Sequence, residues 1–409
     1  MTSRERVAKT INHEQPDRVP VDLGGSRVSG ISVFPYAELC RFAGLQVGPP
    51  QVYDVFQMLA QVQEPFLRRF HIDVVAVPQY RPAYGLRVDE WKPWTLWDGT
   101  DVLVPMQFEP VLQPDGEILI RDAQNPDGPF VARMPKDGYY FDAIDDTSMS
   151  AELSLPDADE YARNLRPLDD EELKFAARTA RELHETTDYA LLGEYWAGGL
   201  GLPLKFGDQM IALATEKQWC AEVLHAQADN AIESAKMYHE AVGERCVAWL
   251  ISGYDYGTQR GELFSPQVFA ELFAPNYRRI NDWVHENTNT KAFYHSCGSN
   301  RELMPIFVQM GVDIFNPVQV TAQGMDAQEL AAEFGNDLVF WGGGVNTQST
   351  LPHGTPQQVA DQAMERCRIF GQGGGYVFNP IHNVQAKTPA ENLVAMLDAV
   401  HEHGTYPLQ

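Results

Sequence analysis

Short runs of consecutive apolar residues recur along the chain, and each is followed by turn residues and then by a stretch of helical periodicity. Such runs are typical of parallel strands that are covered on both faces. Eight strands are predicted, at 18–23, 72–78, 189–193, 247–251, 291–295, 312–316, 338–341 and 376–379. Their alternation with helices predicts an α/β protein with a (β/α)8 architecture, the TIM barrel. A doubly wound parallel sheet is the alternative, because one sequence does not fix the number of strands.

Two Pro-containing pairs predict where helices begin. Ser265-Pro266 and Thr388-Pro389 each combine an N-cap residue with proline at the first helical position. The first pair is expected to open a helix that runs to about Glu286, and the second, with Glu391, to open the last helix. Further helical patterns are found at 217–241, 300–310, 326–335 and 356–369.

The stretch 80–150 interrupts this alternation. It is rich in Pro, Asp and Gly and contains short apolar segments such as Val102-Leu-Val-Pro105 and Ile118-Leu-Ile-Arg121. These features predict a β-hairpin insertion after the second strand, serving as a lid or as an interface, for example in a homodimer. No internal repeat is found, so we expect one barrel domain over 1–409 that carries the insertion 80–150.

Charge and cysteine content narrow the class of protein. Lys and Arg number 31 against 56 Asp and Glu, a net charge of −25, which argues against nucleic acid and anionic membranes as partners and favours a small-molecule substrate. The five cysteines are scattered and odd in number, which indicates a reducing compartment rather than a disulfide framework. The charged start Met1–Val7 and the lack of a membrane-length apolar run predict a cytoplasmic protein.

The carboxyl ends of the predicted strands carry the polar residues. Active sites of such barrels lie at these ends. His295 and Cys297 end the fifth strand, and residues two apart on an extended chain point to the same side. His382 leaves the last strand at the same level. Catalytic zinc takes three N, S or O ligands and leaves one position open, so these three residues predict a zinc site. The alternative for His-x-Cys is a pair of buried core residues.

Two acidic residues at neighbouring strand ends are candidate catalytic groups. Asp255 is expected to act as a general acid or base or to orient a ligand, with a helix cap or loop salt bridge as the alternative. Glu194 is expected to be a fourth zinc ligand, or to contact a zinc ligand and tune it; otherwise it caps a loop.

Other residues on this face are candidate substrate contacts. Tyr254, Asn316 and Gln319 follow strand ends and carry polar side chains, although turn structure explains the two amides equally well. Arg27 is a further candidate substrate contact. The glycines 342–344 would let an anionic group approach backbone N–H groups.

Several motifs, in consistent order, resemble those of the uroporphyrinogen decarboxylase superfamily. The likeness covers nearly the whole chain outside 80–150. More narrowly, the chain is similar to the corrinoid-linked branch, the methylcobamide:coenzyme M methyltransferases. The motifs are Ser3-Arg-Glu-Arg-Val-Ala8, Pro16-Asp-Arg-Val-Pro20, Gly257-Thr-Gln-Arg-Gly261 with Ser265-Pro266, and Thr388-Pro-Ala-Glu-Asn392.

This resemblance implies a TIM barrel that binds zinc through His-x-Cys and a late Cys, and that transfers a methyl group between a methyl-corrinoid and a thiol. His295 and Cys297 match the first two ligands, whereas His382 stands for the third. Two imidazoles and one thiolate leave Zn²⁺ more positive than one imidazole and two thiolates. A bound thiol would ionise more readily but be a poorer nucleophile. The acceptor is therefore left open as a thiol or another small molecule, and a corrinoid protein is the implied partner.

Decarboxylation in tetrapyrrole metabolism is the second hypothesis that the resemblance allows. The decarboxylases grip a polycarboxylate through an Arg-rich N-terminal segment, whereas residues 23–30 here hold Arg27 alone. They lack His-x-Cys, although they place a His in a late Gly-His-Gly near the position of His382. The third hypothesis is a non-catalytic relative that binds a tetrapyrrole or corrinoid at the barrel mouth.

Overall fold

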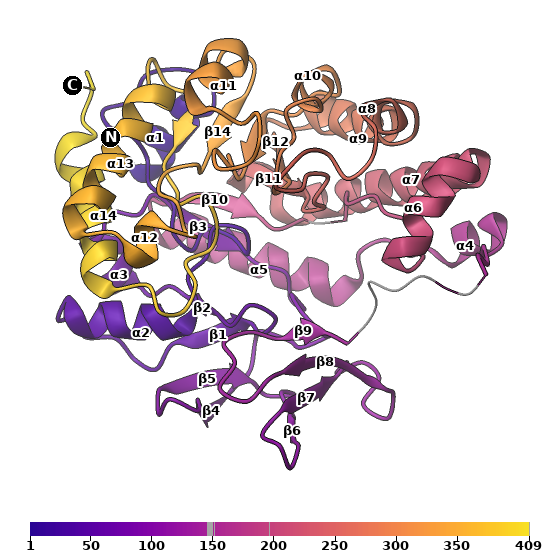
Figure 1. The fold of residues 1–409 in the computed structure, drawn as a ribbon, viewed down its shortest axis with the longest axis horizontal. Coiled ribbons are helices and arrows are strands. Elements are labelled where there is room, and N and C mark those ends of the chain that lie inside the picture. Colours follow the sequence, from indigo (N-terminus) through magenta and orange to yellow (C-terminus); the bar gives the residue numbers. More distant parts are fainter. Residues whose placement is uncertain (145–149, 151, 196, 409) are drawn as a thin grey trace.

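Seven parallel strands form the central sheet of the computed structural model, which describes residues 1–144, 150, 152–195 and 197–408 (Figure 1). Their order in the sheet follows their order along the chain, as in TIM barrels. The strands are β3 (Val74–Val77), β10 (Ala190–Gly193), β11 (Cys246–Ser252), β12 (Lys291–His295), β13 (Ile314–Asn316), β14 (Val339–Trp341) and β15 (Tyr376–Val377). The predicted α/β class and seven of the eight predicted strands are confirmed.

The first predicted strand, 18–23, is not a regular strand but contacts both edges of the sheet. The carbonyl of Val21 accepts from the N–H of Asp73 (2.8 Å), directly before β3. The N–H of Asp22 donates to the carbonyl of Phe378 (2.8 Å), directly after β15. Pro20 has no N–H to add to a ladder, so pairing is limited to isolated bridges.

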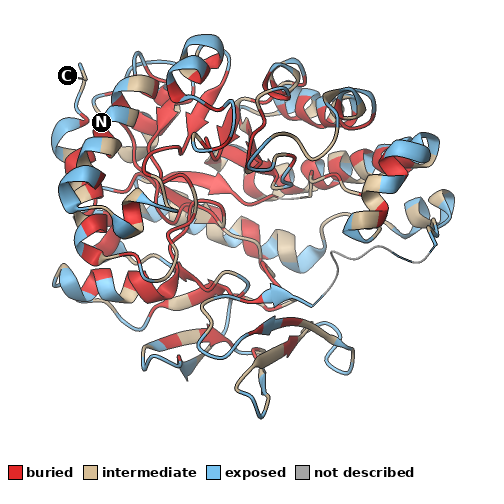
Figure 2. Ribbon diagram, in the orientation of Figure 1, coloured by how far each residue is buried: buried red, intermediate tan, exposed pale blue. Residues whose placement is uncertain are grey.

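The strands of the central sheet are largely buried (Figure 2). Their side chains divide between two buried clusters, as a period of two requires. One set of strand side chains, which includes Leu192, Phe293 and Trp341, forms an inner cluster. The other set packs under the helices, whose outer faces are exposed.

The longer helices are α5 (Asp170–Thr186), α7 (Lys217–Val242), α9 (Ala274–Asn287), α13 (Pro356–Phe370) and α14 (Ala390–His403). The shorter ones are α1 (Ser3–Thr10), α2 (Val33–Phe42), α3 (Glu64–Arg69), α4 (Ala158–Asn164), α6 (Phe206–Thr215), α8 (Pro266–Val268), α10 (Met304–Gln309), α11 (Ala327–Phe334) and α12 (Thr350–His353).

Of the two predicted Pro-containing helix starts, the one at Ser265-Pro266 is confirmed and the one at Thr388-Pro389 is wrong by one residue. The Ser265 hydroxyl accepts from the N–H of Val268 (3.3 Å), and the helical run from α8 to α9 ends at Asn287, close to the predicted end. Thr388 is not an N-cap: α14 starts at Ala390 after Pro389. The Thr388 hydroxyl instead donates to the carbonyl of Gln385 (2.8 Å), inside the preceding loop.

Two small, largely antiparallel sheets lie apart from the central sheet (Figure 1). One joins β1 (Gln51–Asp54), β2 (Leu59–Gln61), β4 (Trp91–Thr95) and β5 (Asp101–Pro105). The other joins β6 (Val111–Leu112), β7 (Ile118–Arg121), β8 (Phe130–Met134) and β9 (Asp142–Ala143). The stretch 80–150 is thus not a single hairpin, because β5 pairs with β1 from before β3. Its residues 145–149 lie outside the described part.

Within the described ranges, no helix has both the length and the apolar character needed to cross a membrane.

Candidate metal centre

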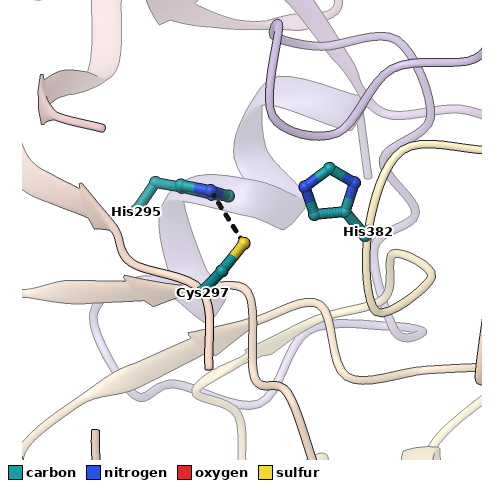
Figure 3. Close-up of side chains that lie close together, drawn as sticks. All are labelled: His295, Cys297 and His382. Carbon is teal, nitrogen blue, oxygen red and sulfur yellow. Dashed lines mark hydrogen bonds between the residues drawn. The ribbon is translucent and has the colours of Figure 1, made fainter. Parts of the chain in front are cut away.

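His295, Cys297 and His382 lie together at the carboxyl ends of two strands (Figure 3). His295 is the last residue of β12, Cys297 follows two residues later, and His382 belongs to the loop after β15. The Sγ of Cys297 is 3.3 Å from Nε2 of His295. One ligand atom from each of the three side chains lies within 4.8 Å of the others. Across the described residues, this is the one such group of three or more His, Cys, Asp or Glu side chains.

The three donors fit zinc. Zn–N and Zn–S bonds of about 2.1 and 2.3 Å place tetrahedral ligand atoms on the order of 3.5 Å apart. The His295–Cys297 separation of 3.3 Å is close to this value, and the three ligand atoms all lie within 4.8 Å of one another. Two imidazoles and one thiol are soft enough for Zn²⁺ and leave its fourth position open.

Burial sets the protonation of all three groups. Burial lowers the pKa of His295, and burial together with the neighbouring His295 lowers the pKa of His382 to about 4. Both imidazoles are therefore neutral near pH 7 and able to donate lone pairs. Burial, and then the carboxylate of Asp255, raises the pKa of the Cys297 thiol. A bound divalent cation would reverse this last preference, because a metal ligand must be deprotonated.

Asp255 lies beside the three residues and reaches solvent. Its Oδ1 accepts from the backbone N–H of Cys297 (2.7 Å) and is 3.6 Å from Nε2 of His295. The side chain is 51% exposed. This position suits both an acid or base at the mouth of the site and a group that orients the Cys297 backbone.

The side-chain amides of Asn316 and Gln319, which are predicted to contact substrate, form hydrogen bonds with protein groups. The fully buried Asn316 places Oδ1 2.6 Å from Nδ1 of His295, and its Nδ2 donates to the carbonyl of Trp341 (2.8 Å). The Oε1 of Gln319 accepts from the N–H of Gly298 (2.7 Å) and so holds the loop after Cys297. Both amides thus have the structural contacts that the alternative interpretation expects.

The backbone N–H groups of Gly342 and Gly344 form hydrogen bonds within the fold. The N–H groups of Gly342 and Gly344 donate to the carbonyls of Val377 (3.1 Å) and Asn379 (2.9 Å). A Cβ on Gly344 would come within 2.6 Å of the Asn379 oxygen, so glycine permits close packing against the last strand. By contrast, Tyr254 is 48% exposed on the loop that carries Asp255, where it is open to a substrate.

Glu194 is buried in a separate polar cluster with Arg27. Its Oε1 accepts from the N–H of Arg27 (2.6 Å) and its Oε2 from that of Gln79 (3.4 Å). Burial raises the pKa of Glu194 to about 7, although Arg27 acts in the opposite direction. Glu194 does not belong to the three-residue group, so the expected fourth zinc ligand is not found there.

Asp54 and Asn383 are site residues that the sequence analysis missed. The buried Asp54 pairs with the guanidinium of Arg27. Asn383, which directly follows His382, accepts from the N–H of Gly30 (2.5 Å) and donates to Gln57 Oε1 (2.8 Å). These contacts hold the loop that carries His382. Neither residue lies in a recognisable motif, and only the adjacency of Asn383 to His382 could have drawn attention to it.

A groove of about 440 Å³ adjoins the loop of His382. Phe56 and Tyr140 are among its lining side chains and are 37% and 51% exposed. The lining also includes Gln57, whose side chain contacts Asn383. The remaining lining residues are Tyr139, Gln385 and Ala386.

A family model described as Uroporphyrinogen decarboxylase (URO-D) matches residues 162–403, more than half of the chain. The chain belongs to the uroporphyrinogen decarboxylase family. The matched range contains His295, Cys297 and His382, and the resemblance found in the sequence is confirmed.

Relatives of two kinds are found within this family. The chain is 28% identical over 144 residues to a methylated-thiol–coenzyme M methyltransferase of Methanosarcina mazei, covering 34% of each chain. It is 41% identical over 59 residues to a uroporphyrinogen decarboxylase of Anaeromyxobacter dehalogenans, covering 14% of this chain and 17% of that one. The chain thus spans about a third or less of each of these curated relatives.

The solved structure of a methyltransferase from Methanosarcina mazei has the same fold. It superposes with a TM-score of 0.58 at 15% sequence identity, over 98% of this chain and 99% of the other. At this identity, the likeness is one of fold.

Proposed function

We propose that this family member is a zinc-dependent methyltransferase that moves a methyl group between a methyl-corrinoid and a thiol or another small acceptor. The observation that carries the proposal is the convergence of His295, Cys297 and His382, with one ligand atom each within 4.8 Å. The similarity to a methylated-thiol–coenzyme M methyltransferase supports the reaction class. A corrinoid protein is the proposed partner that carries the methyl group.

The chain's own residues have distinct roles in this proposal. His295, Cys297 and His382 would hold Zn²⁺, which supplies a Lewis acid that stabilises the acceptor as its anion. Asp255, 3.6 Å from His295 and exposed to solvent, accepts the proton that the acceptor releases. Tyr254 and the groove next to the His382 loop offer aromatic surface to the apolar part of a donor or acceptor.

Decarboxylation of a porphyrinogen is the second candidate, because uroporphyrinogen decarboxylases are also among the relatives. The charge of the site argues against it. Arg27, the one arginine of the segment 23–30, forms an ion pair with the buried Asp54, so its charge is already balanced. A polycarboxylate substrate requires several cations that are not balanced in this way.

Metal content and methyl transfer test the proposal together. We expect the purified protein to contain stoichiometric zinc and to transfer methyl groups from methylcobalamin to a thiol, and both properties to be lost in Cys297→Ser and His382→Ala. The matched controls are Cys220→Ala, a buried thiol on α7, and His403→Ala, an exposed imidazole on α14. A zinc-free protein, or turnover that Cys297→Ser leaves unchanged, would refute the proposal, and metal-independent porphyrinogen turnover would establish the alternative.

A further inference from the structure

Asn316 occupies a position between His295 and the next strand of the sheet. The register of β12 and β13 places His295 directly beside Asn316. The side chain of Asn316 is fully buried, and both ends of its amide have a partner. A buried amide with two defined partners has one orientation, which the partners determine.

The hydrogen-bond partner on the side of Asn316 away from His295 determines which end of the amide faces His295. The backbone carbonyl of Trp341 can only accept a hydrogen bond, so the atom 2.8 Å from it must be Nδ2. Trp341 is itself held in β14, and its indole donates to the buried carboxylate of Asp22 (2.8 Å). The amide therefore cannot rotate without losing this bond, and Oδ1 is turned toward the imidazole.

The oxygen then fixes the tautomer of His295. Oδ1 of Asn316 has no hydrogen to give, so Nδ1 of His295, 2.6 Å away, carries the proton. In the neutral ring, the lone pair is left on Nε2, which is the nitrogen that lies 3.3 Å from the Cys297 sulfur. The ring is thus presented with its donor atom toward the three-residue group.

We propose that Asn316 is a positioning residue that locks His295 in the Nδ1–H tautomer and so prepares Nε2 to bind the metal. The role in metal binding rests on the proposed zinc site, whereas the tautomer is a property of the metal-free chain. Groups that hold the second nitrogen of a metal-binding histidine commonly contribute 10- to 100-fold to metal affinity.

The chain offers a matched control for Asn316. Asn281 is also fully buried, also accepts at Oδ1, from the hydroxyl of Tyr294 (2.9 Å), and also donates from Nδ2 to a carbonyl, that of Met310 (2.9 Å). It contacts no member of the three-residue group through these bonds. Asn281→Leu therefore removes the same number of buried hydrogen bonds as Asn316→Leu without touching His295.

The tautomer is read first, in the metal-free wild-type protein. In ¹⁵N-histidine-labelled protein, the resonances of His295 are assigned from their absence in His295→Ala. We expect a protonated Nδ1 and an unprotonated Nε2 near pH 7. A wild-type spectrum with the proton on Nε2 would overturn the proposal.

Zinc affinity is then measured by competition with a chelating dye. We expect about 10- to 100-fold weaker binding in Asn316→Leu and near wild-type affinity in Asn281→Leu. Asn316→Asp should lose less affinity than Asn316→Leu, because its carboxylate still accepts from Nδ1 although it gives up the bond to Trp341. Unchanged affinity in Asn316→Leu, or an equal loss in Asn281→Leu, would reject the positioning role. If wild-type protein binds no zinc, the proposed function fails, and the tautomer measurement still decides the role of Asn316.

Discussion

The guanidinium of Arg27 is paired with the buried carboxylate of Asp54, with Nε 2.5 Å from Oδ2. The Asp54 side chain has no exposed surface, and that of Arg27 is 15% exposed. Glu194 accepts from the backbone N–H of the same arginine. Arg27 thus contacts two buried acids, Asp54 through its guanidinium and Glu194 through its backbone N–H, which makes it part of the framework that supports the loop at the barrel mouth.

Replacing Arg27 should therefore destabilise the fold. Arg27→Met leaves Asp54 without its partner, and breaking a buried ion pair from one side costs about 3–5 kcal/mol. Urea unfolding measures this loss. Arg68→Met, on the exposed helix pair with Glu64, is the control and should change little. A stable Arg27→Met protein would instead point to an arginine kept for a ligand.

Glu194 should make stability depend on pH. Its pKa in the folded chain is about 7, above the value of about 4.3 for an unfolded chain. The folded state therefore keeps a proton that the unfolded state releases. The contribution to stability is complete below about pH 4 and is lost as pH rises through about 7, on the order of 3 kcal/mol in total.

Glu194→Gln removes this dependence, because the amide does not titrate. Its free energy of unfolding, measured in urea at pH 5 and pH 8, should fall less across this interval than that of the wild type. Glu38→Gln, on the exposed side of α2, should follow the wild-type curve. Parallel curves for wild type and Glu194→Gln would contradict a raised pKa at this residue.

Asp255 should control the reactivity of Cys297 in metal-free protein. Burial and then the Asp255 carboxylate raise the thiol pKa, so little thiolate exists near neutral pH. Asp255→Asn removes the second cause and should speed alkylation by iodoacetamide about three- to tenfold. Mass spectrometry of the peptide that contains Cys297 measures the rate.

Asp282→Asn serves as the control for this experiment, since Asp282 is exposed on α9 and pairs with Arg278. Its alkylation rate should equal that of the wild type. A rate that is unchanged in Asp255→Asn would mean that the carboxylate acts on the Cys297 backbone alone, through the 2.7 Å hydrogen bond.

The sequence predicts the three-residue group because each of its members lies at or shortly after the end of a predicted strand. His295 and Cys297 are two positions apart at a strand end, and His382 lies in the loop after another strand, so knowledge of the barrel is enough to bring them to one face. The role of Asn316 could not be predicted, because it depends on the register of β13 against β12. The same holds for Asp54 and Arg27, which meet through tertiary packing.

Local hydrogen bonding explains the mistaken helix start as well. Thr388-Pro389 has the composition of a cap, but the Thr388 hydroxyl donates to the Gln385 carbonyl of the preceding turn. The segment 18–23 is apolar enough for a strand, yet Pro20 restricts it to isolated bridges. In both cases a local feature decides the outcome, namely a hydrogen bond to the residue three positions before Thr388 and the missing N–H of Pro20.

The groove next to the His382 loop, which Phe56, Tyr139 and Tyr140 help to line, should affect substrate binding more than the chemical step. If a methyl donor or acceptor lies against Tyr140, then Tyr140→Ala should raise KM several-fold and leave kcat nearly unchanged, because that contact is equal in the ground and transition states. Trp94→Ala, another exposed aromatic on β4, is the control. A fall in kcat without a change in KM would place Tyr140 outside the binding surface.

His382→Cys should alter the chemistry of the proposed zinc site while still allowing it to bind the metal. The substitution gives one imidazole and two thiolates, the ligand set of the methyltransferases that the chain resembles. The second thiolate makes the metal less positive, so a bound thiol should ionise at higher pH but react faster as an anion. We expect retained zinc, an acid limb of the pH–rate profile displaced to higher pH, and a higher plateau rate.

The His382→Ala protein provides the comparison, since it lacks the third ligand altogether. A profile identical to that of the wild type would mean that residue 382 does not bind the metal on which the reaction depends.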